Sequence, residues 1–243
     1  MIVLGAVAGW FIGILLNWAA GFLPRYAANH SATPIKPDVP SKPALLQLLA
    51  ALATRRDAAR LPRSLWLNLG VELLTAMLFA WLWSHALAVF NLLLLSLVCS
   101  FLILVAVIDL RYRLVLNVLV LPAALLTVLA RYATPGTNML TVFLGGAFGF
   151  AIFAMVALLR PGELGGGDVK LATLIGLAFG FPDALWALMT GVLAGGIVAV
   201  LMLLSHQSDS KSQIPYAPFL CLGALIALLY NPISLVLYTL TGH

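Results

Sequence analysis

Two acidic residues lie where an apolar chain should least tolerate a charge. Asp109 closes the apolar run 101–108, and Asp168 directly follows the glycines 165–167. A carboxylate at the edge of hydrocarbon is costly, so it is usually retained for a function. Two carboxyl groups close enough to share a proton cannot both ionise, so one can accept a proton while the other donates one. We therefore assign Asp109 and Asp168 to one acid–base site assembled between helices.

The composition shows which class of protein carries these acids. Hydrophobic residues make up 63% of the chain and charged residues 9%, and the mean hydropathy is +1.09. Soluble domains are about half apolar and a quarter charged. The sequence therefore predicts an all-α, polytopic integral membrane protein. Its net charge of +5 requires no nucleic-acid partner, because the distribution of basic residues over the loops accounts for it.

Apolar stretches predict about eight helical spans. They are Ile2–Phe22, Trp66–Ser84, Leu87–Ile108, Val115–Arg131, Met139–Leu159, Val169–Phe181, Ala184–Ser205 and Ala217–Leu240. Val169–Phe181 would reach only about 20 Å, short of a hydrocarbon core about 30 Å thick. Either the bilayer thins there or the glycine-rich stretch before it lies below the membrane surface. In both cases we expect Asp168 to face an aqueous pocket.

The spans predict a single membrane domain, residues 1–243, with one sizeable insertion. Pro24–Leu65 is predicted to be a cytoplasmic loop made of a Pro-rich linker and an interfacial helix, Ala44–Arg60. Of the Lys and Arg residues, only Arg131 falls on the side of the termini. The positive-inside rule places the other loops in the cytoplasm. Both aspartates then lie at the cytoplasmic face.

Several motifs resemble one family, and they occur in its order along the chain. They are Gly13-Ile-Leu-Leu-Asn17 with Leu23-Pro24-Arg25, Val71-Glu72-Leu73-Leu74, Ile108-Asp109-Leu110 with Leu121-Pro122, Gly165-x-Gly167-Asp168 with Lys170, and Ile214-Pro215-Tyr216-Ala217-Pro218-Phe219-Leu220. The G-x-G-D motif resembles that of intramembrane aspartic proteases. The whole set resembles bacterial type IV prepilin peptidases.

This resemblance implies an aspartic endopeptidase of the bacterial inner membrane. It would remove the short basic leader from a prepilin or pseudopilin at the cytoplasmic face, with Asp109 and Asp168 as catalytic residues. Gly165 and Gly167 would leave room beside the aspartate for an extended peptide. Lys170 would support the charged form of the pair or anchor its loop. The expected partners are the substrate and the lipid bilayer, and acid and base are not assigned individually.

The resemblance also bears on cofactors. Many members of the family carry Cys-x-x-Cys motifs in the first cytoplasmic loop, which resemble a zinc site. Pro24–Leu65 contains no cysteine, so we predict no zinc and no other metal site. Many members also methylate the new N-terminus with S-adenosylmethionine. Changes such as Ile14 and Leu116, together with the short loop, leave that second activity open here.

Other interpretations of the same residues remain. Asp168 is also predicted to be the N-cap of a helix that begins at Val169. Glu72 and Asn17 lie inside spans, where they would form interhelical hydrogen bonds or line a substrate or cofactor pocket. A small transporter or channel using both aspartates as a proton or cation relay is the alternative function. A noncatalytic pilus assembly component is a third. The position of both acids towards one face favours the protease.

Overall fold

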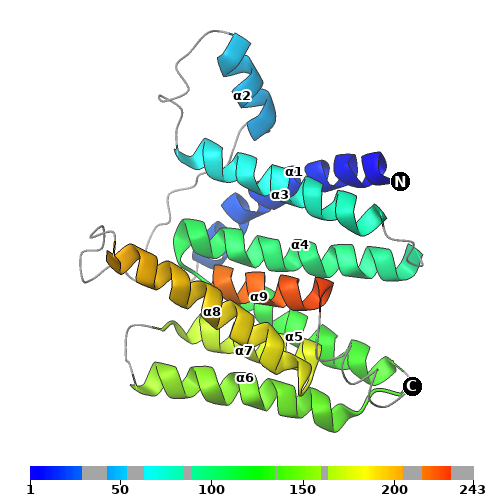
Figure 1. Ribbon diagram of the computed structural model, residues 1–243, viewed down its shortest axis with the longest axis vertical. Helices are drawn as coiled ribbons and strands as arrows, with labels where there is room; N and C mark the ends of the chain where they lie inside the picture. Colours follow the sequence, from blue (N-terminus) through cyan, green and yellow to red (C-terminus); the bar gives the residue numbers. More distant parts are fainter. Residues whose placement is uncertain are drawn as a thin grey trace. The chain divides into compact units, whose positions relative to one another are not determined.

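The computed structural model describes residues 1–28, 43–53, 63–84, 89–134, 136–159, 164–204 and 215–230. Within these residues the chain is all-helical (Figure 1). The helices are α1 (Ile2–Ala28), α2 (Ala44–Ala53), α3 (Arg63–Ser84), α4 (Val89–Tyr112), α5 (Asn117–Ala133), α6 (Met139–Leu159), α7 (Gly166–Phe179), α8 (Asp183–Leu204) and α9 (Ala217–Leu229).

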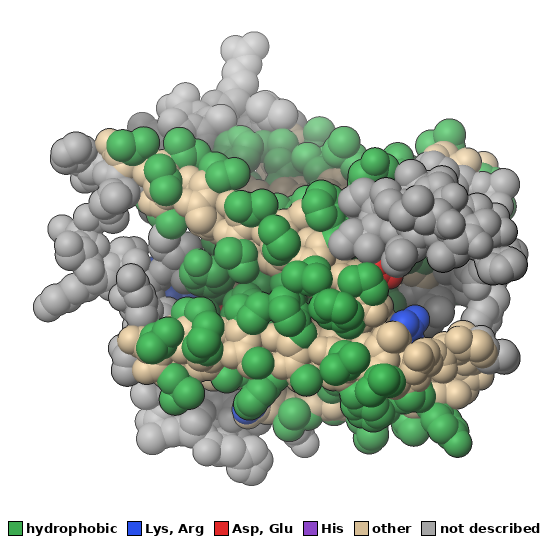
Figure 2. Space-filling view, turned by 60° about the horizontal axis from the view of Figure 1, so that its bottom comes forward, with side chains coloured by type: hydrophobic (Ala, Val, Ile, Leu, Met, Phe, Trp, Pro, Cys, Tyr) green, Lys and Arg blue, Asp and Glu red, His purple; other side chains and the backbone are tan. Residues whose placement is uncertain are grey.

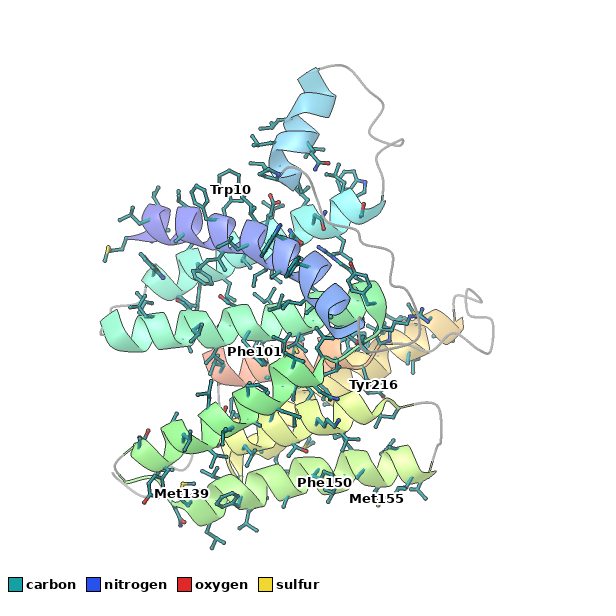
Figure 3. All side chains as sticks on the ribbon, turned by 180° about the vertical axis from the view of Figure 1, so that it is seen from behind. Trp10, Phe101, Met139, Phe150, Met155 and Tyr216 are labelled. Carbon is teal, nitrogen blue, oxygen red and sulfur yellow. The ribbon has the colours of Figure 1, made fainter. Side chains whose placement is uncertain are left out.

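In the described part of the chain, five helices contain segments long and apolar enough to cross a membrane. The segments are Ile2–Pro24, Ser64–Ser84, Leu95–Tyr112, Met139–Leu159 and Asp183–Met202, and α5 and α9 are shorter apolar helices. Large hydrophobic side chains face outward along the helices, as Figure 2 shows for one face. Phe150 and Met155 of α6, labelled in Figure 3, are each 55% exposed. Such surfaces suit hydrocarbon rather than water, and the prediction of an all-α polytopic membrane protein is confirmed.

Two of the predicted spans need comment. The helix expected at Val169–Phe181 extends from Gly166 to Phe179, so it begins three residues earlier than expected. The span expected at Ala217–Leu240 begins at Ala217 as predicted, and its helix ends at Leu229. Residues 231–240 lie outside the described part, as do most of the Pro-rich linker and the basic residues Arg55, Arg56 and Arg60.

The chain divides into two compact units, Met1–Ile108 and Asp109–His243, with the boundary inside α4. In the first unit α3 contacts both α1 and α2. Ala44 of α2 packs with Leu65 and Leu69 of α3 in a small apolar cluster. A helix, α2, is therefore present over Ala44–Ala53, within the predicted interfacial helix Ala44–Arg60. Its position at the membrane interface remains a prediction. The single domain 1–243 remains a prediction.

The second unit is organised around α7, which contacts α5, α6, α8 and α9. Figure 1 shows α6, α7 and α8 side by side within this unit. Helices α6 and α7 approach closely where Gly145 and Gly176 meet, because a Cβ on either glycine would collide with the backbone carbonyl of the other. Leu171, Ala172 and Ile175 of α7 are at most 2% exposed. This packing holds α7 firmly, and with it the residues of its first turn.

Candidate active site

Asp168 lies in the first turn of α7. Gly165 is the N-cap, and Asp168 is the third residue of the helix. The Gly165 N–H donates a hydrogen bond of 3.2 Å to Asp168 Oδ2, and the Asp168 N–H donates one of 3.0 Å to the Gly165 carbonyl. The expectation that Asp168 itself is the N-cap was therefore wrong. The glycines allow the helix to begin earlier, and the carboxylate reaches back to the cap in the manner of a capping box.

Asp109 lies in the last turn of α4 and is 5% exposed. Its carboxylate accepts a hydrogen bond from the backbone N–H of Ala217, the first residue of α9. Its Oδ2 atom is buried and has no hydrogen-bond partner among the described residues. The first N–H groups of a helix lack internal partners and attract anions. Both aspartates thus meet a helix N-terminus, Asp168 that of α7 and Asp109 that of α9.

The two carboxyl groups interact electrostatically. Asp168 is 8% exposed and lies outside the five candidate spans. Burial first, and then the negative charge of Asp109, raise the pKa of Asp168 to about 6, against the opposing effect of the Gly165 hydrogen bond. The Arg113 guanidinium lies within range of the Asp109 charge. The two aspartates that the sequence singled out therefore lie close enough for their charges to interact.

The three glycines before Asp168 differ in their surroundings. A Cβ on Gly167 would lie 2.6 Å from the Val115 Cβ, so Gly167 allows the segment after α4 to pack against α7. Gly166 has no atom within 4 Å of the position of its Cβ, and at Gly165 the nearest is Asp168 Oδ2 at 3.4 Å. Gly167 thus makes room for the chain itself. The open side of the motif is at Gly165 and Gly166.

Lys170 is exposed, and its Nζ donates a 2.8 Å hydrogen bond to Asn117 Oδ1. Asn117 is the first residue of α5, so this bond ties the start of α5 to the start of α7. The groups that act on the charge of Asp168 are Asp109 and Gly165. Of the two roles expected for Lys170, the geometry favours the anchor.

Glu72 and Asn17 belong to the unit Met1–Ile108, and contacts within that unit occupy both. Glu72 Oε1 accepts a bond from the Ala44 N–H, and Oε2 accepts bonds from the Leu45 N–H and Trp10 Nε1. Glu72 thereby caps α2 and joins it to α1 and α3. Asn17 donates a 3.0 Å hydrogen bond to the Asn68 carbonyl, linking α1 and α3. These contacts favour the structural interpretation of both residues over a pocket.

Potential metal ligands do not cluster in the described part of the chain. No group of three or more His, Cys, Asp or Glu residues that could hold a metal ion occurs among the described residues. Cys99 and Cys221 are buried free cysteines. The absence of zinc stays a prediction.

Comparison with known proteins gives a family match for the aspartate region. Residues 96–200 match the model of the type IV leader peptidase family. The matched residues include Asp109, Asp168, Gly165, Gly167 and Lys170, whereas Glu72 and Ala217 lie outside the match.

Two relatives carry the name prepilin leader peptidase/N-methyltransferase. The protein of Bacillus subtilis (strain 168) is 31% identical over 132 residues, which cover 54% of this chain and 53% of the relative. The protein of Pseudomonas aeruginosa is 29% identical over 131 residues, which cover 52% of this chain and 45% of the relative. The match therefore spans about half the length of either relative. No solved structure matches the chain.

Several residues of the site were not selected from the sequence. Val115 and Asn117 position the start of α7, and Ala217 supplies the N–H that meets Asp109. Pro218, the second residue of α9, is a typical helix-start signal that marks Ala217 as carrying a free N–H. No local pattern could identify Val115, because its partner Gly167 is distant in the chain.

Proposed function

We propose that this protein is a prepilin leader peptidase, an aspartic endopeptidase that removes the short basic leader of a prepilin or pseudopilin. The observation that carries the proposal is the pairing of two buried carboxyl groups, Asp109 and Asp168, inside the region that matches the model of the type IV leader peptidase family. Among the described groups, Asp109 is the charged side chain that acts on Asp168. A transporter would more often place such acids near the membrane midplane.

The pair can hydrolyse a peptide bond without a metal ion. One carboxylate takes a proton from a water molecule, whose oxygen attacks the scissile carbonyl carbon. The other, protonated carboxyl gives its proton to the carbonyl oxygen, and a geminal diol forms. When the diol collapses, one hydroxyl proton returns to a carboxylate, the C–N bond breaks and the leaving amine receives a proton. The pair ends with the single proton it began with.

The environment of each acid supports this division of labour. Asp168 has one oxygen fixed by Gly165, and its raised pKa of about 6 favours the protonated form near neutral pH more than for an ordinary aspartate. Asp109 keeps one oxygen, Oδ2, without a partner. We propose that Oδ2 of Asp109 holds the attacking water, and that the pair carries one shared proton. The apparent pKa values then belong to the pair.

We propose that the site lies on the cytoplasmic side of the bacterial inner membrane, because the topology predicted from the sequence puts nearly all Lys and Arg residues in loops on the side of the aspartates. The substrate helix would dock between spans, and its basic leader would lie along the aqueous face. The cut would follow a glycine at the end of the leader. The exposed glycines Gly165 and Gly166 leave one flank of Asp168 open to an extended peptide.

Methylation of the new N-terminus is a second candidate activity, favoured by the names of both relatives. It would require S-adenosylmethionine, whose ribose hydroxyls are commonly held by a buried acid. The described acid outside the pair that is fully buried, Glu72, has both oxygens occupied by N–H groups and does not fit that role. We therefore derive no methyl-transfer step, and mass measurement of the cleaved product tests for an added methyl group.

Cleavage of a prepilin by detergent-purified protein tests the proposal. The variants are Asp109→Asn and Asp168→Asn, which keep the shape of each side chain, with Asp183→Asn at the start of α8 as the matched control. We expect wild type and Asp183→Asn to release the leader, and both site variants to lose at least about 1,000-fold in rate, as removal of an acid–base group does. Cleavage that persists in either site variant would refute the assignment. Folded wild type that does not cleave, yet conducts protons in liposomes, would favour the transporter.

A further inference from the structure

Tyr112, the last residue of α4, has an enclosed hydroxyl group without a partner. Its ring is half-buried, but its Oη atom is buried and makes no hydrogen bond to any described residue. A buried hydroxyl without a hydrogen bond is costly, and such groups in native proteins usually meet water or a ligand. The Tyr112 hydroxyl therefore calls for a partner that is not part of the described chain.

The position of Tyr112 on the helix relates it to Asp109. Residues three apart lie on the same face of an α-helix, and long side chains in helices lean back towards the preceding turn. Tyr112 follows Asp109 by about one turn, so we expect its ring to lean towards the turn that carries the carboxylate. Asp109 Oδ2 is likewise buried and unpartnered. The end of α4 thus carries two polar atoms without a hydrogen-bond partner among the described residues, the Tyr112 hydroxyl as a donor and Asp109 Oδ2 as an acceptor.

The other unpartnered buried polar atoms in the described residues do not form such a pair. They belong to Trp83 on α3, Ser96 on the first half of α4, Arg131 at the end of α5 and Asp183 at the start of α8. None of them lies within one helical turn of Asp109 or Asp168. Among the described residues with such an atom, Tyr112 is the one that lies within one helical turn of an aspartate of the site.

The substrate of a peptidase can satisfy both groups at once. A peptide carbonyl oxygen accepts hydrogen bonds, and the attacking water donates one to the carboxylate. We propose that the Tyr112 hydroxyl contacts substrate and donates a hydrogen bond to the carbonyl oxygen of the bond that the aspartates cleave. This inference rests on the peptidase function proposed above. The hydroxyl transfers no proton. Its hydrogen bond strengthens as charge gathers on that oxygen, which lowers the barrier more than it tightens substrate binding.

The test is the variant Tyr112→Phe, which removes only the hydroxyl. Tyr132→Phe is the matched control, because Tyr132 is 77% exposed on α5 and outside the site. Cleavage of a prepilin is measured as kcat and KM, together with the midpoint of thermal unfolding. We expect Tyr112→Phe to lower kcat by about 100- to 1,000-fold with KM within about threefold of wild type, since loss of one such donor has effects of this order. The unfolding midpoint should not fall, because the hydroxyl has no partner in the protein to lose.

Unchanged kcat in Tyr112→Phe, with wild type active, would overturn the role of Tyr112 and leave the peptidase standing. A loss of activity fully accounted for by loss of folded protein would overturn it as well, because the residue would then be structural. Absence of cleavage by folded wild type would instead overturn the proposed function itself.

Discussion

Gly165 and Asp168 are joined by two hydrogen bonds that run in opposite directions across the start of α7. The helix N-terminus favours the negative charge of Asp168, whereas burial and the neighbouring charge of Asp109 oppose it more strongly. The outcome is a pKa raised to about 6. A purely structural role for Asp168 would not require a raised pKa at the start of its own helix.

The raised pKa of Asp168 predicts a stability that depends on pH. The folded protein binds the Asp168 proton more tightly than the unfolded chain, whose pKa is near 3.8, so ionisation costs stability as pH rises from about 4 to about 6 and the cost is complete above that. Asp168→Asn cannot ionise. The difference in unfolding free energy between Asp168→Asn and wild type should therefore change with pH. From pH 4 to pH 7.5 it should shift in favour of the variant by on the order of 2–3 kcal/mol.

Thermal unfolding in detergent at several pH values measures this difference. A gap between Asp168→Asn and wild type that stays constant from pH 4 to pH 7.5 would contradict the raised pKa.

The glycines at 166 and 167 should respond in opposite ways to the same substitution. Gly167→Ala would place a Cβ 2.6 Å from that of Val115, so the first turn of α7 must shift. We expect a loss of about 1–3 kcal/mol in stability and a strong loss of cleavage. Gly166→Ala meets no atom within 4 Å and improves helix propensity, so stability should hold or rise by about 0.5 kcal/mol.

Unfolding and cleavage assays on both variants test the contrast. Equal losses in Gly166→Ala and Gly167→Ala would show that flexibility of the motif, and not the contact with Val115, is what matters.

Removal of the Glu72 carboxylate should release α2. Glu72→Ala would leave the buried Ala44 N–H and the Leu45 N–H without their acceptor and would lose the bond to Trp10. We expect a loss of about 3 kcal/mol or more, since a buried charged acceptor is removed. Glu72→Gln keeps one acceptor oxygen and should therefore lose less stability than Glu72→Ala.

Limited proteolysis in detergent reports on α2 directly. Faster cleavage of the chain near residues 44–53 in Glu72→Ala than in Glu72→Gln is the expected order. Identical protection in both variants and wild type would show that apolar packing on Leu65 and Leu69 suffices to hold the helix.

Lys170 should matter little for catalysis. Its hydrogen bond to Asn117 is exposed, and exposed polar pairs contribute at most about 1 kcal/mol. Lys170→Met should therefore lower the unfolding midpoint slightly and leave kcat within about threefold of wild type. Asn117→Ala should resemble it, because both variants lose the same bond. A loss in Lys170→Met that approaches the loss in Asp168→Asn would instead give Lys170 a direct part in the reaction.

Cleavage should not depend on zinc. The loop 24–65 contains no cysteine, and the described residues contain no cluster able to hold a metal ion. Treatment with a strong chelator should leave both the rate and the unfolding midpoint unchanged, and elemental analysis should find less than about one zinc per ten chains. Loss of activity that added zinc restores would contradict this expectation.

The sequence by itself determined the all-helical membrane class and singled out the two aspartates. Hydrophobic stretches and isolated charges are local features, and the cost of a carboxylate in an apolar run is visible without coordinates. The order of motifs also indicated the family whose model residues 96–200 match. The G-x-G-D pattern did not fix the start of α7, because glycines permit a helix to begin before or after them.

Only the tertiary structure decided what each polar group meets. The Ala217 N–H donates to Asp109, and Val115 packs against Gly167. Glu72 accepts a hydrogen bond from the start of α2, 28 residues away in the sequence. The unpartnered oxygens of Asp109 and Tyr112 are likewise visible only in the folded chain. Which group a free backbone N–H meets, and whether a side chain finds a partner, depend on the packing of helices far apart along the chain, which no local pattern encodes.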